Sequence, residues 1–336
     1  MAAKKPDNPY YQGPVSDHFD GMRFFVPGGE APGNLASLLK WQFREKRHKW
    51  PKSYPSPFHG TVPEPRVEGS RMVVTMIGHA SLLIQTAGVN ILTDPVWSNR
   101  VSPVQFAGPK RVNPPGVKLE DLPQIDILVV THNHYDHMDS ASLRTIIKAH
   151  DPLVVTPLGN DTIMRKFAPK ARFAVMDWGD ALETHGLRIH AEMSYHWSAR
   201  GTGDRRMALW AAFVFDTPAG KIYHIGDTGF HDGSHYRAIA EKHGKIRLAI
   251  LPIGAYEPRW FMKGQHQNPQ EAVGGFKLCG AEYAVGHHWG TFQLTNEAIH
   301  HPVDHLCEAL MEAAIEPARF RALRPGETAE IPSVGK

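Results

Sequence analysis

Short apolar runs separated by turn-forming residues recur along most of the chain, a pattern typical of β-strands. Three such runs, RMVVTMI, SLLIQT and VNILTD, follow one another from residue 71, and the breaks at Gly78-His79 and Ala87-Gly88 indicate an antiparallel meander. Further strands are expected near residues 125–130, 153–156, 172–175, 187–194, 208–215, 221–226, 246–253 and 281–286, and helices near 140–149, 160–167, 235–243, 269–278 and 303–314. Because apolar strands need cover on both faces, this order predicts an α/β (α+β) fold of two mixed sheets with helices outside them.

The N-terminal part lacks this pattern. Residues 1 to about 33 show no sustained period, and Asn34 is a suitable N-cap for a helix with an apolar stripe that ends before Pro51. Its second half, KWQFREKRHKW, is basic and aromatic, which favours a helix packed on the domain by its leucines with a solvated cationic face; a membrane-surface role is the alternative. We therefore expect residues 1–69 to form an arm, a helix and a linker packed on a catalytic domain of residues 70–336.

The stretch THNHYDHMDS (residues 131–140) directly follows the apolar run IDILVV. The run predicts a buried strand, so the polar residues begin where that strand ends, which is where open α/β sheets bind ligands. His132 and His134 would point to one side of an extended backbone, and Asp136 and His137 can turn back toward them. A catalytic zinc takes three protein ligands, so this supply indicates two metals. A solvated histidine-rich loop would not account for the ordered His-x-His-x-Asp-His spacing.

Polar residues also stand at the ends of other predicted strands. His196 follows LRIHAEMS, Asp227 follows KIYHIG, and a histidine pair follows EYAVG. These residues can complete two metal sites. One site would use His132, His134 and His196, the other Asp136, His137 and either His287 or His288, with the Asp227 carboxylate bridging.

Asp94, after NILT, and His79 are expected to contact these ligands rather than the metals. A metal-bound imidazole usually donates its second N–H to a carboxylate or carbonyl, and a strand-end aspartate is a suitable acceptor. For each of the two, an ordinary turn residue is the alternative.

Imidazole and carboxylate ligands suit zinc, and iron, manganese or cobalt would also be accepted. Two such metals about 3.5 to 4 Å apart could hold a hydroxide between them. Two divalent cations, two aspartates and one hydroxide leave a net charge of about +1, which favours an anionic substrate such as a phosphodiester.

Composition sets the remaining limits. With 336 residues and a net charge of +3, the chain is not basic enough to indicate nucleic acid, although weak attraction to an acidic membrane surface is compatible with it. Cys279 and Cys307, without CxxC spacing, are expected to be packing residues in a reducing compartment. No apolar stretch reaches the roughly 18 residues of a membrane span, and the start has no secretory signal. We expect a cytoplasmic protein; a peripheral location on the inner face of the membrane and a homodimer are both compatible with the sequence.

The His-x-His-x-Asp-His loop, with the later His, Asp and His, resembles the metallo-β-lactamase superfamily, whose fold is a four-layer αβ/βα sandwich with a binuclear site at one edge. Longer blocks resemble one branch of it, N-acyl-phosphatidylethanolamine phospholipase D and its bacterial relatives. These blocks are IGHASLLIQ, LTDPVWSNRVSP, GPKR, THNHYDHMD, GDTG, LPIGAYEPRWFMKGQHQNPQEAV and HWGTF. The resemblance implies two zinc ions on the residues above, with His288 rather than His287 as the ligand, and contacts to the substrate phosphate from Tyr135 and His266.

The function expected from this resemblance is metal-dependent hydrolysis of a phosphodiester, of phospholipase D type, which releases an N-acylethanolamine-like headgroup. Tyr135 and His266 would stabilise charge on the phosphoryl oxygens, and Asp227 or a water would protonate the leaving alkoxide. A lactonase or another ester hydrolase is the nearest alternative. An oxygen-reducing di-iron protein would need more carboxylate ligands, and a non-catalytic lipid-binding protein would not need a complete ligand set.

Overall fold

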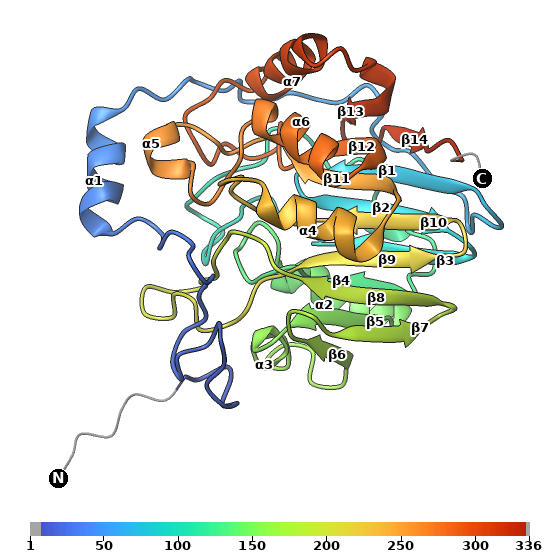
Figure 1. Cartoon of the computed structure of the whole chain (residues 1–336), viewed down its shortest axis with the longest axis horizontal. Coiled ribbons are helices and arrows are strands. Elements are labelled where there is room, and N and C mark those ends of the chain that lie inside the picture. Colours follow the sequence, from blue (N-terminus) through green and yellow to red (C-terminus); the bar gives the residue numbers. More distant parts are fainter. Residues whose placement is uncertain (1–7, 334–336) are drawn as a thin grey trace.

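Two seven-stranded sheets form the centre of the computed structural model, which describes residues 8–333 (Figure 1). The first seven residues of the expected arm and the last three of the expected catalytic domain lie outside this range. One sheet has the order β14 (Thr328–Glu330), β1 (Met72–Gly78), β2 (Ser81–Thr86), β3 (Val89–Thr93), β4 (Ile127–Val129), β5 (Leu153–Pro157), β6 (Arg172–Met176). The other has the order β13 (Phe320–Ala322), β12 (Ala281–His287), β11 (Ile246–Pro252), β10 (Gly220–His224), β9 (Ala212–Thr217), β8 (Leu187–Glu192), β7 (Ala181–Thr184).

Helices cover the outer face of each sheet. On the first sheet these are α2 (Ser140–His150) and α3 (Asn160–Met164), and on the second α4 (Ser234–His243), α6 (Pro269–Leu278) and α7 (His301–Glu312). The two short helices α1 (Leu35–Arg44) and α5 (Arg259–Met262) lie together away from the sheets (Figure 1). Helix, sheet, sheet and helix thus form four layers, and the expected fold class is confirmed.

The strands read as continuous apolar runs because each sheet is buried on both faces. Along β2, Leu82 and Ile84 enter the core between the sheets, where they join Phe213 and Ile250 of the second sheet. Leu83 points the other way, into the core under α2 and α3. The period-2 alternation of a strand therefore distributes one apolar run between two cores.

The parallel strands of both sheets end at one edge of the sandwich. In the first sheet β3, β4, β5 and β6 are mutually parallel, and in the second β10, β11, β12 and β13 are. The segments that follow β4, β10 and β12 carry the histidines and aspartates singled out in the sequence. The topology thus gathers residues far apart in the chain.

The first helix differs from the expectation in length. It ends at Arg44, not near Trp50, although Asn34 caps it as expected by accepting a hydrogen bond from the Ser37 backbone N–H.

The apolar stripe of this helix is only partly exposed. Phe43 is 84% exposed, whereas Leu38 lines a cavity together with residues of the main domain. Trp41 also holds the helix, because its indole N–H donates to Asn296 Oδ1 at 2.9 Å. Packing of the helix on the domain through its leucines stays a prediction.

Four short elements escaped sequence analysis: β7, β13, β14 and α5, each of three or four residues. Such lengths are too short for a periodic pattern to emerge. The N-terminal segment before α1 adds a small core of its own, in which Phe19 and Phe24 pack with Leu209 and Trp210. We propose that the N-terminal segment up to residue 69 is an arm of the catalytic domain rather than an independent unit.

Candidate metal centre

The loop after β4 is folded tightly enough to present several side chains at once. The backbone N–H groups of His137 and Met138 both donate to the His134 carbonyl, and Asp139 caps α2 by accepting from the Ala141 N–H. Arg200, from the segment after β8, donates to the Met138 carbonyl at 2.6 Å and to a second loop carbonyl. These bonds fix the loop that carries four of the expected ligands.

Three imidazoles form the first group. His134 Nδ1 lies 2.9 Å from His132 Nε2 and 3.2 Å from His196 Nε2. His196 Nδ1 must donate to the Gln265 carbonyl at 3.0 Å, because a carbonyl only accepts. Thr131 donates its hydroxyl proton to Asp94, so its oxygen accepts from His132 Nδ1 at 3.0 Å. In the neutral state the Nε2 lone pairs of His132 and His196 therefore point inward.

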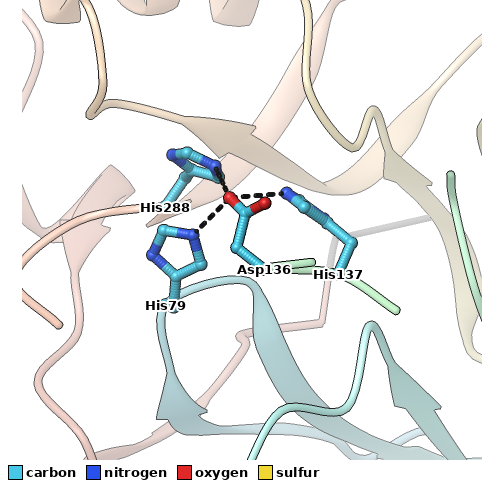
Figure 2. Close-up of side chains that lie close together, drawn as sticks. All are labelled: His79, Asp136, His137 and His288. Atoms are coloured by element: carbon cyan, nitrogen blue, oxygen red, sulfur yellow. Dashed lines mark hydrogen bonds and ion pairs between the residues drawn. The ribbon is translucent and has the colours of Figure 1, made fainter. Parts of the chain in front are cut away.

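The second group surrounds one oxygen of Asp136 (Figure 2). Asp136 Oδ2 lies 3.0 Å from His79 Nε2, 3.1 Å from His288 Nε2 and 3.5 Å from His137 Nε2. His137 directs its other nitrogen, Nδ1, to Asp94 Oδ2 at 2.8 Å. Asp94 therefore contacts an expected ligand through the ring nitrogen that faces away from Asp136. His79, in contrast, reaches the same Asp136 oxygen as His288 and belongs to a group of side chains that could hold a metal ion, so its role behind the ligands stays a prediction.

Asp227 lies between the two groups. Its Oδ2 is 3.2 Å from the Nε2 atoms of both His137 and His288, 3.6 Å from His196 Nε2 and 3.9 Å from His132 Nε2. Its Oδ1 is buried and has no hydrogen-bond partner among the described residues. One carboxylate oxygen therefore lies within 4 Å of imidazole nitrogens from both groups.

The charges of this buried cluster favour cations. Burial raises the pKa of Asp227, but His288 and His137 outweigh it and hold the pKa well below the usual range. Burial lowers the pKa of His288, but Asp227 and Asp136 outweigh it and raise the pKa to about 9. For His134, burial and the neighbouring His196 lower the pKa to about 3. Ionised carboxylates that draw positive charge into a dry site, together with imidazoles, are a donor set that fits divalent metal ions.

Without metal, the stability of the protein should depend on pH with a maximum near neutrality. His288 has a folded pKa of about 9 against 6.5 unfolded, so its contribution is present below pH 6.5 and is lost as the pH rises to 9. His134 and His196 have folded pKa values of about 3 and 4. As the pH falls below 6.5, these two side chains bind protons in the unfolded chain but not in the folded protein, so the free energy of unfolding decreases. Thermal melts of chelated protein from about pH 5 to about pH 10 should therefore peak near pH 6.5. A melting temperature that is constant over this range would contradict the expectation.

The remaining expected site residues, His288, His266 and Tyr135, differ in whether they face the cluster. His288 joins the cluster, whereas His287 is buried with its ring centroid 6.3 Å from that of His288 and belongs to neither group. His266 faces the cluster, with Nδ1 at 4.0 Å from Asp227 Oδ2. The Tyr135 hydroxyl, in contrast, donates to the Arg200 carbonyl at 3.0 Å, and the Arg200 guanidinium lies 3.9 Å from the Tyr135 ring centroid.

Sequence reasoning missed two residues of the site. Arg200 donates hydrogen bonds to two backbone carbonyls of the loop after β4. The backbone carbonyl of Gln265 accepts a hydrogen bond from His196 and so orients its ring. Neither carries a signal in the sequence, because each acts on a partner more than 60 positions away. Only the tertiary fold brings these partners together.

A cavity of about 320 Å³ opens from this cluster. At one end it is lined by His134, Asp136, Asp227 and His266. At the other end it is apolar and is formed by α1 and α5 together with neighbouring loops. The apolar lining residues include Leu38, Trp41, Trp197, Phe261, Met262 and Leu294.

A family model described as a beta-lactamase superfamily domain matches residues 89–289. The chain belongs to the metallo-β-lactamase superfamily. This superfamily member is 37% identical over 311 residues to N-acyl-phosphatidylethanolamine-hydrolyzing phospholipase D 1 of Caenorhabditis elegans, covering 88% of this chain and 86% of that protein. It is 34% identical over 247 residues to the mitochondrial N-acyl-phosphatidylethanolamine-hydrolyzing phospholipase D of Saccharomyces cerevisiae, covering 71% and 52%. A metal-dependent hydrolase of Pyrobaculum islandicum is 30% identical over 263 residues, covering 77% and 100%.

Solved structures agree on the fold of this superfamily member. Isothiocyanate hydrolase from Delia radicum gut bacteria superimposes with a TM-score of 0.59 at 24% identity, covering 77% of this chain and 98% of that one. The metallo hydrolase Igni18 from Ignicoccus hospitalis gives 0.57 at 21% identity, with the same coverage. The resemblance noted in the sequence is thereby confirmed, and the chain is a hydrolase of the metallo-β-lactamase type with a candidate metal-binding His/Asp cluster.

Proposed function

We propose that this protein is a binuclear, zinc-dependent phosphodiester hydrolase of phospholipase D type. Its substrate would be N-acyl-phosphatidylethanolamine or a related phospholipid, from which it releases an N-acylethanolamine-like headgroup. The observation that carries this proposal is the position of Asp227, whose Oδ2 lies between two groups of imidazoles at the end of an apolar pocket. The names of the worm and yeast relatives point to the same substrate class.

Two metal ions would be held by the two groups of residues on either side of Asp227. When bound, they would polarise phosphoryl oxygens and acidify a water molecule. Zinc is favoured over iron because five of the seven proposed ligands are imidazoles. The proposed ligands are His132, His134 and His196 for one ion, and Asp136, His137 and His288 for the other, with Asp227 shared.

The pocket supports a lipid substrate because it is polar at one end and apolar at the other. A phosphate at the cluster would leave the attached chains against Leu38, Trp41 and Phe261. A volume of about 320 Å³ lies at the lower end of the range of ligand sites, so it would hold part of a lipid, with the rest extending outward.

The remaining catalytic groups would bind and orient the phosphate. Burial keeps the pKa of His266 well below the usual range, so the ring is neutral and can donate one N–H to a phosphoryl oxygen. Tyr135 could do the same once its hydroxyl leaves the Arg200 carbonyl. Asp227 Oδ1, which has no hydrogen-bond partner among residues 8–333, could hold a proton for the leaving alkoxide. Since the pKa of Asp227 is held low by His288 and His137, water is the better proton donor.

A contact with the membrane surface would supply such a substrate. None of the described helices is long and apolar enough to cross a bilayer. Leu39, Phe43 and Trp260 are nonetheless exposed at 47%, 84% and 45% around the apolar end of the pocket, and the Lys40 ammonium lies 4.4 Å from the Trp260 ring centroid. Exposed apolar side chains with an adjacent cation suit an anionic interface.

Phe43→Ser should therefore weaken binding to anionic phosphatidylglycerol vesicles by about ten- to a hundredfold, since inserting a phenyl ring contributes roughly 1.5 to 3 kcal/mol. Co-sedimentation with vesicles measures the partition coefficient. Val62→Ser is the matched control, because Val62 is also exposed (69%) but lies in the linker. Equal binding by Phe43→Ser and the wild-type protein would remove the membrane role.

Substrate class is tested by comparing initial rates on N-acyl-phosphatidylethanolamine, bis(4-nitrophenyl) phosphate and an acyl-homoserine lactone. The proposal expects turnover of both phosphodiesters, with the lipid preferred. Turnover of the lactone without either phosphodiester would instead establish an ester hydrolase of the same fold.

A further inference from the structure

One cationic side chain of the pocket has no role in the site described so far. Arg205 is the only arginine or lysine among the described residues that line the cavity. It comes from the loop between β8 and β9, and it stands among the apolar side chains rather than among the proposed metal ligands.

The guanidinium of Arg205 is held on two sides. Its Nη1 donates to the Gly33 carbonyl at 2.8 Å, and its Cζ lies 4.9 Å from the Trp197 ring centroid. Trp197 in turn packs edge-on against His134, with ring centroids 4.6 Å apart. Trp197 therefore contacts both Arg205 and a proposed metal ligand.

The charge of Arg205 is not balanced by the protein. Among residues 8–333, no carboxylate lies within ion-pair distance of this guanidinium, and the Gly33 carbonyl is its only hydrogen-bond acceptor. A guanidinium has five N–H donors in a planar fork that suits a carboxylate or phosphate. A half-buried cation with free donors and a fixed position in a pocket is suited to an anionic part of the ligand.

We propose that Arg205 forms an anion-binding subsite, which selects substrates with a second anionic group beyond the scissile phosphodiester. This inference rests on the proposed function. The scissile phosphate would lie at the cluster, and Trp197 contacts both this cluster and Arg205. The second charge would thus be a few bonds away from it, as in a phospholipid whose headgroup carries a carboxylate.

The test compares kcat/KM on N-acyl-phosphatidylserine, which carries a headgroup carboxylate, with kcat/KM on N-acyl-phosphatidylethanolamine, which does not. The wild-type enzyme should prefer the serine lipid, and Arg205→Gln should lower this preference about tenfold, the effect of 1.4 kcal/mol and near the value of one charge-assisted hydrogen bond. The loss should appear mainly in KM. Arg205→Lys should keep part of the preference, and Arg206→Gln, next in the chain but outside the pocket lining, should keep all of it.

A second measurement does not depend on turnover. Laurate, a carboxylate with an apolar chain, should bind the metal-loaded Arg205→Gln protein about tenfold more weakly than wild type by calorimetry. An unchanged lipid preference together with an unchanged laurate Kd would overturn the subsite while leaving the proposed function standing. Equal losses on both lipids would also overturn it, because Arg205 would then serve the scissile phosphate or the fold. If wild type cleaves neither lipid, the proposed function fails, and the laurate comparison alone decides the subsite.

Discussion

Asparagine in place of Asp227 is expected to lower headgroup release by about a thousandfold, a loss at the upper end of that seen when one principal electrostatic group is removed. Asp227 is the only carboxylate whose oxygen lies within 4 Å of histidines from both groups in the described part of the chain. Asparagine has the same shape but no charge, so the substitution removes the shared anionic ligand without leaving a cavity. The metal content should fall in parallel.

The control for this variant is Asp126→Asn. Asp126 is also largely buried and is paired with Arg66, but it precedes β4 at the opposite end of that strand from the metal loop. The control should lose stability and keep its activity per folded molecule. If Asp227→Asn kept both its metal and its rate, the shared role of Asp227 would be wrong.

Removal of the metals is expected to abolish activity and to lower the melting temperature by on the order of 10 °C. A ligand present at a thousand times its Kd stabilises the folded state by about 4 kcal/mol. For a chain of this size, each kcal/mol corresponds to roughly 1.4 °C, so two ions whose effects add shift the melting temperature by about 10 °C. The fall in melting temperature would arise because buried carboxylates and imidazoles lose their partners when the ions are removed.

Differential scanning fluorimetry before and after dialysis against a chelator measures this shift. Restoring zinc should restore both the melting temperature and the rate. Asp227→Asn provides the comparison, since a variant that has already lost its metal should show little further change on chelation. Full activity in chelated wild-type protein would rule out a metal-dependent mechanism.

The architecture was readable from the sequence because both sheets are buried on both faces. The run SLLIQT coincides with β2. Helix α6 begins at Pro269, where a helix was expected, and Asn268 and Glu271 cap its first turn. The positions of the candidate ligands were also predictable. Parallel strands end at the same edge of a sheet, so a histidine or aspartate that directly follows such a strand lies at this edge.

What the sequence could not supply depended on contacts between distant segments. The choice of His288 over His287 required knowing which of two adjacent side chains turns toward Asp136; in the structure His288 adopts a φ of +64°, which turns it there. The Tyr135 hydroxyl has an acceptor 65 positions away, and Trp41 is fixed by a partner 255 positions away. The apolar stripe of α1 did not reveal which of its side chains are buried, because exposed and buried stripes have the same period.

The most direct measurement of the central claim is elemental analysis of the purified protein combined with a headgroup-release assay on N-acyl-phosphatidylethanolamine. We expect two zinc ions per chain and release of N-acylethanolamine in proportion to zinc occupancy, with both lost in Asp227→Asn. A single metal per chain, or headgroup release that does not follow metal content, would contradict a binuclear phosphodiester hydrolase.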